Sequence, residues 1–376
     1  MKIKFLKLLL LSFLISTTSC STSVEDILVE DEISENVEEE TQEEEEEEEE
    51  NENSQETSEE ENSNGEENTT STSFVADHGQ LRVRGAKIVD KNGETVQLRG
   101  MSFFWSQWMG KYYNAEIVKW LKDDWQCNIV RVAMGVDEGG EAYIANPEIE
   151  KQKAYAVIDA AIAEGIYVII DWHTHHGEDY ITEAKIFFDE VSKKYGDTPN
   201  IIYETYNEPL DVSWETVLKP YHEEVIATIR NNDADNLIIC GTRTWSQRVD
   251  EVIGKTIDDT NIAYTLHYYS ATHDQDLRDI AQKAIDNDIA IFVTEYGITE
   301  ADGGGTFNSD ESQKWWDFLD ENSIGWCNWS IADKEELSAA LKPGASTAGE
   351  WSENDLTASG AIIRAEIKAK NPNYTN

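Results

Sequence analysis

The chain has 376 residues, a net charge of −46 and four cysteines without a CxxC spacing. The acidic charge argues against nucleic acid or an anionic membrane surface as a partner of the folded part, because like charges repel. The cysteine spacing predicts no zinc site, and we expect Cys127, Cys240 and Cys327, which lie in or beside apolar runs, to be buried small hydrophobic residues.

Residues 1–19 have the pattern of a signal peptide, with three lysines ahead of an apolar run at 8–15 that is too short to span a bilayer. Small polar residues then lead to Cys20, as at the lipid-attachment site of a bacterial lipoprotein, although Thr17 stands where leucine is usual. We therefore expect export and a lipid anchor at Cys20 on the outer membrane or cell surface, which would be the chain's membrane contact. Secretion without an anchor is the alternative.

Residues 20–73 predict an acidic disordered tether. Residues 21–73 contain 24 Asp or Glu and no Lys or Arg, including the unbroken run Glu43–Glu50. Such a segment cannot bury enough apolar surface to fold, and its charges repel one another. From Phe74 the composition becomes globular, and all twelve tryptophans follow. The folded domain is therefore expected over residues 74–376.

The folded part begins with short strand-like runs at Gln80–Val83, Lys87–Val89 and Thr95–Leu98, separated by Gly85 and Asn92-Gly93. Runs of this length with glycine turns are typical of a small β cap at the bottom of a barrel.

Eight strand-like runs follow, separated by helical patterns. The runs lie at Leu98–Phe103, Asn128–Ala133, Ile166–Ile170, Ile201–Tyr206, Leu237–Cys240, Ala263–Leu266, Ala290–Thr294 and Gly325–Asn328. The clearest helical patterns lie at Pro147–Glu164, Ile181–Tyr195, Trp214–Asn231, Leu277–Asn287, Ser309–Asn322 and Leu356–Ala369. This alternation predicts an α/β fold, a (β/α)8 TIM barrel, with no internal sequence repeat.

Polar and aromatic residues stand at or just after the ends of seven of the eight runs, where the active site of such a barrel lies. One such residue is ordinarily a satisfied structural group, but so many together favour a site. They are Arg131, Asp171-Trp172-His173, Asn207-Glu208, Trp245, His267 and Tyr269, Glu295, and Trp329.

Two glutamates at the mouth of the barrel suggest glycoside hydrolysis. Glu208 and Glu295 follow the fourth and seventh runs, so they face each other, and Pro209 ends the fourth strand. Hydrolysis of a glycoside needs one acid to protonate the leaving oxygen and one carboxylate to attack or to activate water. Tryptophans can provide flat platforms for sugar rings. Glu204 lies inside the run, so it is not a candidate for the acid.

The order and spacing of eight segments carry a resemblance to a known family. They are Leu98–Ser102, Asp124–Met134, Tyr167–His173, Tyr203–Pro209, Gly241–Gln247, Leu266–Tyr269, Phe292–Gly297 and Asn328–Lys334. Through them, residues 79–370 resemble a bacterial glycoside hydrolase family 5 endo-β-1,4-glucanase (cellulase) of the subgroup similar to secreted Bacillus enzymes.

The resemblance implies Glu208 as general acid/base and Glu295 as nucleophile of a retaining mechanism through a covalent glycosyl-enzyme. It implies that Arg131 and Tyr269 keep Glu295 ionised and that Asn207 binds the sugar 2-hydroxyl. His173 would bind sugar hydroxyls, and His267 would lie beside the acid/base. The substrate-binding residues would be Trp108 on the glycone side, Trp245 on the leaving side, Trp329 under the cleaved sugar, and Trp172, Lys334 and Glu336.

The resemblance implies a β-1,4-glucan as substrate, no cofactor, no metal and a monomeric catalytic domain. Gly135 stands where relatives often have a tyrosine, and Phe103–Trp105 replaces a more polar stretch, so subsite preference can differ. Another β-glucan, xyloglucan or mannan is an alternative substrate. A metal-dependent hydrolase using the histidines of residues 171–176 and a non-catalytic glucan-binding lipoprotein are less favoured alternatives. No separate cellulose-binding module is visible, which favours soluble or amorphous glucan.

Overall fold

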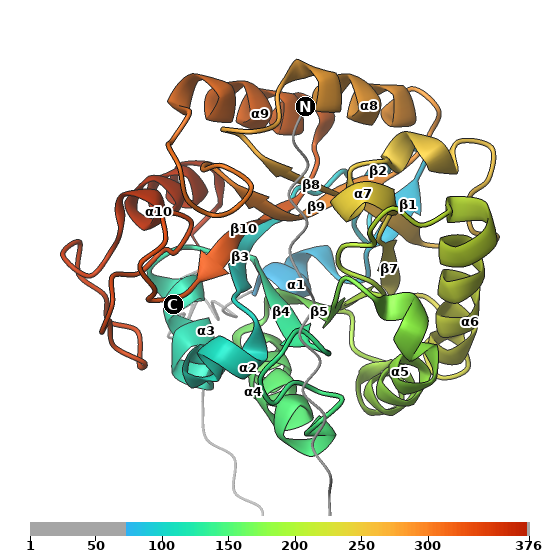
Figure 1. Ribbon diagram of the computed structural model, residues 1–376, viewed down its shortest axis with the longest axis horizontal. Coiled ribbons are helices and arrows are strands. Elements are labelled where there is room, and N and C mark those ends of the chain that lie inside the picture. Colours follow the sequence, from blue (N-terminus) through green and yellow to red (C-terminus); the bar gives the residue numbers. More distant parts are fainter. Residues whose placement is uncertain (1–72, 374–376) are drawn as a thin grey trace, which may run out of the picture. The chain divides into compact units, whose positions relative to one another are not determined.

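The computed structural model describes residues 73–373, and eight parallel strands in them close into a barrel (Figure 1). The predicted (β/α)8 TIM barrel is confirmed. The strands are β3 (Arg99–Phe103), β4 (Ile129–Gly135), β5 (Tyr167–His173), β6 (Ile201–Glu204), β7 (Leu237–Cys240), β8 (Ile262–Tyr269), β9 (Ile291–Gly297) and β10 (Trp326–Ile331). They pair in sequence order, and β10 closes the barrel onto β3. The predicted signal peptide, Cys20 and the acidic tether up to residue 72 lie outside the described residues.

Helices cover the outside of the barrel, as Figure 1 shows. The longer ones are α3 (Ala115–Asp123), α4 (Pro147–Glu164), α5 (Ile181–Tyr195), α6 (Lys219–Arg230), α8 (Gln275–Ile285), α9 (Ser309–Asn322) and α10 (Ala358–Lys370). The predicted helix 214–231 begins instead with a π-helical turn at Trp214–Leu218 before α6. Helix α3 was not among the predicted helices, although Asn114 caps its first turn.

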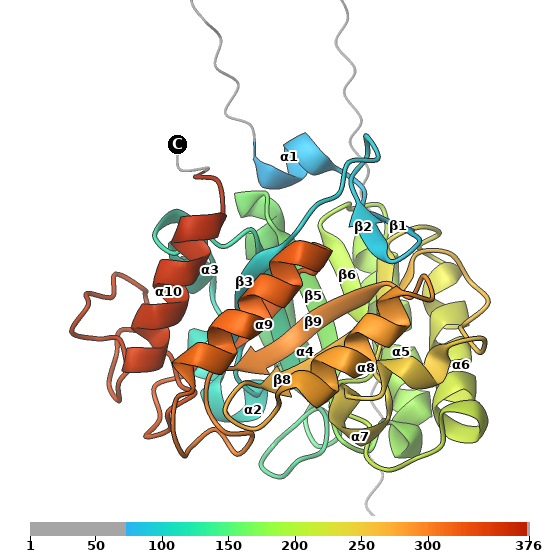
Figure 2. The same ribbon diagram turned by 90° about the horizontal axis from the view of Figure 1, so that it is seen from above.

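A cap covers one end of the barrel, opposite the end that carries the short helices α2 (Ser106–Met109) and α7 (Arg243–Ser246) (Figure 2). It consists of α1 (Phe74–His78) and the antiparallel strands β1 (Arg82–Arg84) and β2 (Lys87–Val89). Its apolar side chains form one cluster with those of the barrel interior, so the cap seals the bottom. The third predicted cap strand is wrong, because residues 95–98 contribute only an isolated bridge between Val89 and Thr95.

Polar groups collect at the other end of the strands. Strand β8 is longer than predicted and contains His267 and Tyr269, and its register places His267 beside Glu295 of β9. Strand β6 ends at Glu204, two residues earlier than predicted, so Asn207 and Glu208 lie in the turn beyond it. Cys127, Cys240 and Cys327 are buried, as expected, and they are free thiols.

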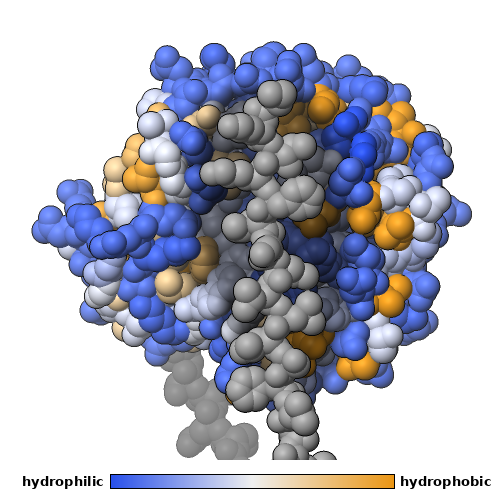
Figure 3. Space-filling view, in the orientation of Figure 1, coloured by the Kyte–Doolittle hydropathy of each residue, from blue (hydrophilic) through white to orange (hydrophobic). Residues whose placement is uncertain are grey.

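Hydrophilic residues dominate the face shown in Figure 3, and hydrophobic ones form small separate patches. No helix in residues 73–373 combines the length and the apolar character needed to cross a bilayer.

The close approach of β3 and β4 gives a stability prediction. Gly100 of β3 and Ile129 of β4 are paired across the two strands. A Cβ atom on Gly100 would lie 1.8 Å from the backbone oxygen of Ile129. Gly100→Ala should therefore lower the free energy of unfolding by about 1–3 kcal/mol, as overpacking does. Urea-induced unfolding measures this change. Gly304→Ala is the control, because a Cβ atom on Gly304 would lie 3.4 Å from Oδ1 of Asp302, which is an ordinary van der Waals distance. Equal effects of the two substitutions would contradict the steric account.

Candidate active site

The predicted pair of glutamates meets at the carboxyl ends of the strands. A carboxylate oxygen of Glu208 and one of Glu295 lie within 4.8 Å of each other. In retaining glycosidases the two carboxyl groups are about 5–5.5 Å apart, whereas inverting enzymes need about 6.5–9.5 Å to admit a water molecule. The separation therefore fits direct attack by one carboxylate on the sugar.

Glu295 is held from two sides and is only 5% exposed. The Tyr269 hydroxyl donates to its Oε1 at 2.7 Å, and Nη1 of Arg131 donates to its Oε2 at 3.1 Å. Burial and the charge of Glu208 nevertheless raise the pKa of Glu295, outweighing the lowering by His267, Arg131 and Tyr269. Arg131 and Tyr269 make the expected contacts and favour the ionised form, but they do not bring the pKa of Glu295 below its ordinary value. Its ionisation also depends on the protonation of Glu208.

Arg131 is the hub of the buried polar groups. Its side chain is fully buried and contacts three carboxylates, those of Glu204, Asp171 and Glu295. Nη2 also donates to Oδ1 of Asn207 at 2.7 Å. The amide NH2 of Asn207 is thereby turned away from Arg131, which leaves it free to donate to a ligand.

Glu208 has two histidine partners. Nε2 of His175 lies 3.1 Å from its Oε2, and Nδ1 of His267 lies 2.9 Å from its Oε1. Burial raises the pKa of Glu208, but the bonds from His175 and His267 outweigh burial and bring the pKa well below its ordinary value in the free protein. The two histidines therefore favour the ionised form of Glu208 in the free protein.

Aromatic residues line the cleft around the two glutamates, which has a volume of about 220 Å³. Trp329 stacks on His173, with ring centroids 5.2 Å apart and planes 12° from parallel. Nδ1 of His173 lies 2.6 Å from Asp171, so its other nitrogen is the one available to a ligand. Phe104, Trp105, Lys334 and Glu336 complete this side, with Lys334 paired to Glu336 at 2.5 Å.

Exposed tryptophans flank the catalytic pair. Trp108 is 48% exposed and packs against Trp105, and Trp245 is 47% exposed. Trp245 lines a space of about 450 Å³ that also reaches Glu208, His267 and His273. Trp245 thus shares a space with Glu208, Trp108 packs on the Phe104 and Trp105 side of the cleft, and their roles as sugar platforms stay predictions.

The turn that presents Trp245 is anchored to the turn of the acid. Residues 244–246 all have positive φ, between 52° and 59°. The backbone N–H of Trp245 donates to the carbonyl of Pro209, and the Ser246 hydroxyl donates to the carbonyl of Asn207. The leaving-side platform and the Asn207–Pro209 turn therefore hold each other in place.

The assignment of Trp172 to substrate binding is wrong. Its side chain is 0% exposed and packs in the core against Tyr143, Phe187 and Phe188. Side chains alternate along β5, so Asp171 and His173 face the barrel interior while Trp172 faces the helices.

The alternative of a metal site in residues 171–176 is not supported, because His173 is bonded to Asp171 and His175 to Glu208. Among the described residues, the group of possible ligands close enough to share an ion is Glu208, His267 and Glu295. The Arg131 guanidinium against Glu295 places a fixed positive charge there, which disfavours a cation.

Three polar residues of the site were not predicted. His175 entered only the metal alternative, although its place two residues beyond His173 at the strand mouth could have signalled a contact with the acid. Glu204 was set aside, yet a charged residue inside an apolar run must have a buried partner. Thr294 carries no such signal, because threonine is common in strands.

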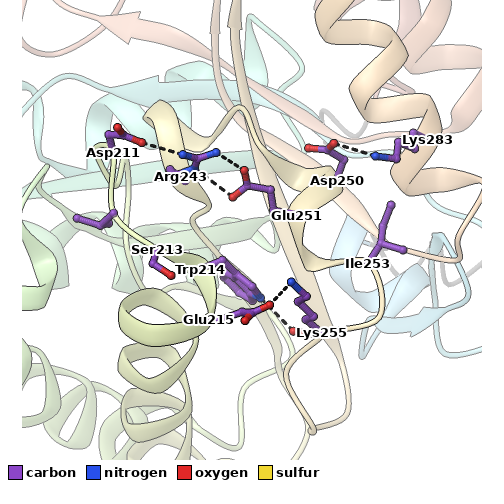
Figure 4. Close-up of a pocket in the computed structure, with 11 residues that line it drawn as sticks. Asp211, Ser213, Trp214, Glu215, Arg243, Asp250, Glu251, Ile253, Lys255 and Lys283 are labelled. Carbon is purple, nitrogen blue, oxygen red and sulfur yellow. Dashed lines mark hydrogen bonds and ion pairs between the residues drawn. The ribbon is translucent and has the colours of Figure 1, made fainter.

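A larger cavity of about 850 Å³ lies elsewhere, between the turn after β6 and the segment after β7 (Figure 4). Its charged side chains are paired with one another. Arg243 contacts Asp211 and Glu251, Lys255 contacts Glu215, and Lys283 contacts Asp250. It contains none of the predicted site residues, so its size does not make it the reaction site.

The barrel, the carboxylate pair and the aromatic cleft together define a glycoside hydrolase. The chain belongs to the cellulase family, glycosyl hydrolase family 5, which residues 89–335 match. It is 46% identical to endoglucanase N of Pectobacterium atrosepticum over 80% of this chain and 68% of that protein. It is 47% identical to endoglucanase A of Evansella cellulosilytica over 73% of this chain, but spans only 57% of that relative.

Solved structures agree with this membership. A structure from Cytophaga hutchinsonii is 53% identical with a TM-score of 0.79, covering 80% of this chain and 98% of that one. The catalytic domain of Thermobifida fusca endoglucanase Cel5A, as a variant in complex with cellotetraose, is 33% identical with a TM-score of 0.75, covering 78% and 99%.

The coupling of the two glutamates gives a pH prediction. Glu208→Gln removes the charge that raises the pKa of Glu295, so Glu295 should stay ionised to lower pH. The acid limb of kcat/KM on an aryl β-cellobioside with a good leaving group should move down by about half to one pH unit. Such a substrate needs little protonation, so the rate stays measurable.

Glu336→Gln is the matched control, because it removes a carboxylate from the same cleft that is paired with Lys334. Its acid limb should stay in place. An acid limb that stays or rises in Glu208→Gln would show that the two carboxylates are not coupled.

Proposed function

We propose that the protein is a retaining endo-β-1,4-glucanase that cleaves internal bonds of cellulose or related β-glucans by double displacement. The observation that carries the proposal is the short separation, within 4.8 Å, between a carboxylate oxygen of Glu208 and one of Glu295. Each carboxylate also has its own set of hydrogen-bond partners. Glu295 attacks the anomeric carbon while Glu208 protonates the leaving oxygen. Water then attacks the glycosyl-enzyme, and Glu208 takes its proton.

The environment of the sugar supports this assignment. The Asn207 amide would donate to the 2-hydroxyl, where such bonds strengthen in the transition state. Trp329, which lines the cleft, would lie beneath the sugar that is cleaved, and the exposed Trp108 and Trp245 would serve as platforms on the glycone and leaving sides. Platforms on both sides suit a chain that continues in both directions, which is what internal cleavage requires.

The names of the relatives, which are endoglucanases, favour β-1,4-glucan as the substrate. Another β-glucan or mannan is the second candidate, because Gly135 leaves room that Gln107 fills, with its Oε1 1.8 Å from where a Cβ would be. A panel of carboxymethylcellulose, mixed-linkage β-glucan, xyloglucan and mannan, with product analysis, separates these candidates.

Glu295→Gln should lower the rate on carboxymethylcellulose at least about a thousandfold, because it removes the attacking carboxylate. Wild-type products followed by NMR should first have the β configuration. Glu353→Gln, at an exposed site, is the control and should leave the rate unchanged. Substantial residual activity in Glu295→Gln would contradict the nucleophile assignment, and an α product would mean inversion.

We propose further that the exported chain carries a lipid on Cys20, with residues 20–73 as a tether. The support is the sequence pattern alone. The full chain produced in a bacterial host should partition into the detergent phase of Triton X-114, and Cys20→Ser should move it to the aqueous phase. The same distribution for both proteins would refute lipidation.

A further inference from the structure

Glu204 is a buried carboxylate beneath the catalytic pair that has no part in the mechanism above. It is fully buried at the end of β6 and accepts two bonds from Arg131, at 2.7 Å from Nε and at 3.2 Å from Nη2. Its Oε1 also accepts from the Thr294 hydroxyl at 2.7 Å. A carboxylate with three donors is ionised, and Arg131 and His267 lower its pKa in spite of burial.

Thr294 connects this carboxylate to His267. Its Oγ1 lies 2.8 Å from Nε2 of His267. A hydroxyl has a single hydrogen, and ionised Glu204 can only accept, so the hydrogen of Thr294 points to Glu204. The Thr265 hydroxyl, which also contacts Oγ1 of Thr294, then donates to it. The oxygen of Thr294 must then accept a bond from His267, which requires a proton on Nε2.

The other nitrogen of His267 faces the acid. Nδ1 lies 2.9 Å from Oε1 of Glu208, which accepts when it is ionised. Both ring nitrogens therefore donate, and the imidazole is a cation. Burial opposes this charge, but Glu204, whose Oε1 lies 3.8 Å from Nε2, and Glu208 outweigh it and raise the pKa of His267 to about 9. The charged and titratable groups that act on it are Glu204, Glu208, Glu295 and His173, and those that line the same space are His175, Tyr269, His273 and Asp302.

We propose that Glu204 is a positioning residue that acts through Thr294 and His267 to supply the proton that Glu208 donates. This inference rests on the proposed role of Glu208 as acid/base. As the glycosidic bond breaks, the leaving oxygen takes a proton from Glu208, and Nδ1 of His267 restores it to the carboxylate. Glu295 forms the new bond to the anomeric carbon. When water attacks in the second step, its proton returns through Glu208 to His267.

A purely structural role is the alternative, in which Glu204 only neutralises Arg131. That role would lower activity or stability at every pH alike. The relay predicts a change in the basic limb of the pH profile, because activity depends on the proton of His267.

Glu204→Gln tests the relay with almost no change of shape. The amide oxygen stays on Nε of Arg131, and the NH2 takes the place of Oε1, where it gives up the longer bond from Nη2 and faces Thr294. The hydrogen of Thr294 then turns to Nε2 of His267. His267 becomes a neutral acceptor there and its pKa falls. A group with a raised pKa keeps its proton up to that pKa, so the basic limb of kcat/KM should move to lower pH by about one unit or more.

The size of the leaving-group effect is the second readout. The rate of Glu204→Gln should fall about tenfold or more on an aryl β-cellobioside with a poor leaving group and less on one with a good leaving group. A uniform loss for both substrates with an unmoved basic limb would overturn the relay.

Thr294 provides a test that does not disturb the charge beside Arg131. Thr294→Val removes the bridging hydroxyl and should shift the basic limb in the same direction, whereas Thr294→Ser keeps the hydroxyl and should restore the wild-type profile. If Glu204→Gln does not fold, this pair decides the question alone, and identical profiles for Val and Ser would refute the relay.

Thr205→Val is the matched control. Thr205 follows Glu204 directly, and its buried hydroxyl is bonded to His222 and not to the catalytic groups. The basic limb of the kcat/KM profile of Thr205→Val should stay in place. A shift equal to that of Thr294→Val would overturn the proposal. Failure of the proposed function is distinguishable, because wild type would then not hydrolyse β-glucan or Glu295→Gln would retain activity. Unshifted profiles in an active enzyme refute the relay only.

Discussion

The buried guanidinium of Arg131 is the interaction on which the rest of the site depends. An arginine without partners inside a barrel would cost several kcal/mol, so it has to be surrounded by acceptors. Here β5, β6 and β9 each supply a carboxylate, from Asp171, Glu204 and Glu295. One cation thereby fixes groups from three strands, and the strands keep it away from water. The proposed nucleophile is one of these three carboxylates, so its position is determined by the same ion cluster.

The proposed catalytic groups and the proposed sugar platforms lie on different parts of the fold, and the difference matches how precisely each must be positioned. Groups that handle protons or bond formation lie in strands or directly after them, where the β8 and β9 register sets His267 beside Glu295. The exposed Trp108 and Trp245, the proposed sugar platforms, lie on the short helices α2 and α7 outside the barrel wall. Proton transfer and bond formation need reacting atoms held in a near-attack geometry, whereas stacking on a sugar ring tolerates larger shifts. The tryptophans can therefore lie on less rigid elements than the strands.

The sequence predicted the barrel and the two glutamates because both depend on local patterns, namely apolar runs of strand length and polar residues at their ends. It failed where the orientation of a side chain decides the role. Trp172 lies between two site residues, but the alternation along β5 turns it into the core. Glu204 was set aside for lying inside a run, although the interior of this barrel is where the ion cluster forms. The pKa of Glu295 depends on Glu208, which lies far away in the sequence, so no local pattern could give it.

The two glutamates differ most in the kind of partner each has. Glu208 is bonded to His175 and His267, whose imidazole rings can give up and take back a proton. Glu295 is bonded to Arg131 and to Tyr269, whose pKa is raised by burial and by the charge of Glu295, so neither partner loses its proton near neutral pH. An acid/base changes protonation twice in each double displacement, whereas a nucleophile must stay without a proton. The barrel therefore gives exchangeable protons to one carboxylate and fixed hydrogen bonds to the other, and this asymmetry agrees with the proposed roles of Glu208 as acid/base and Glu295 as nucleophile.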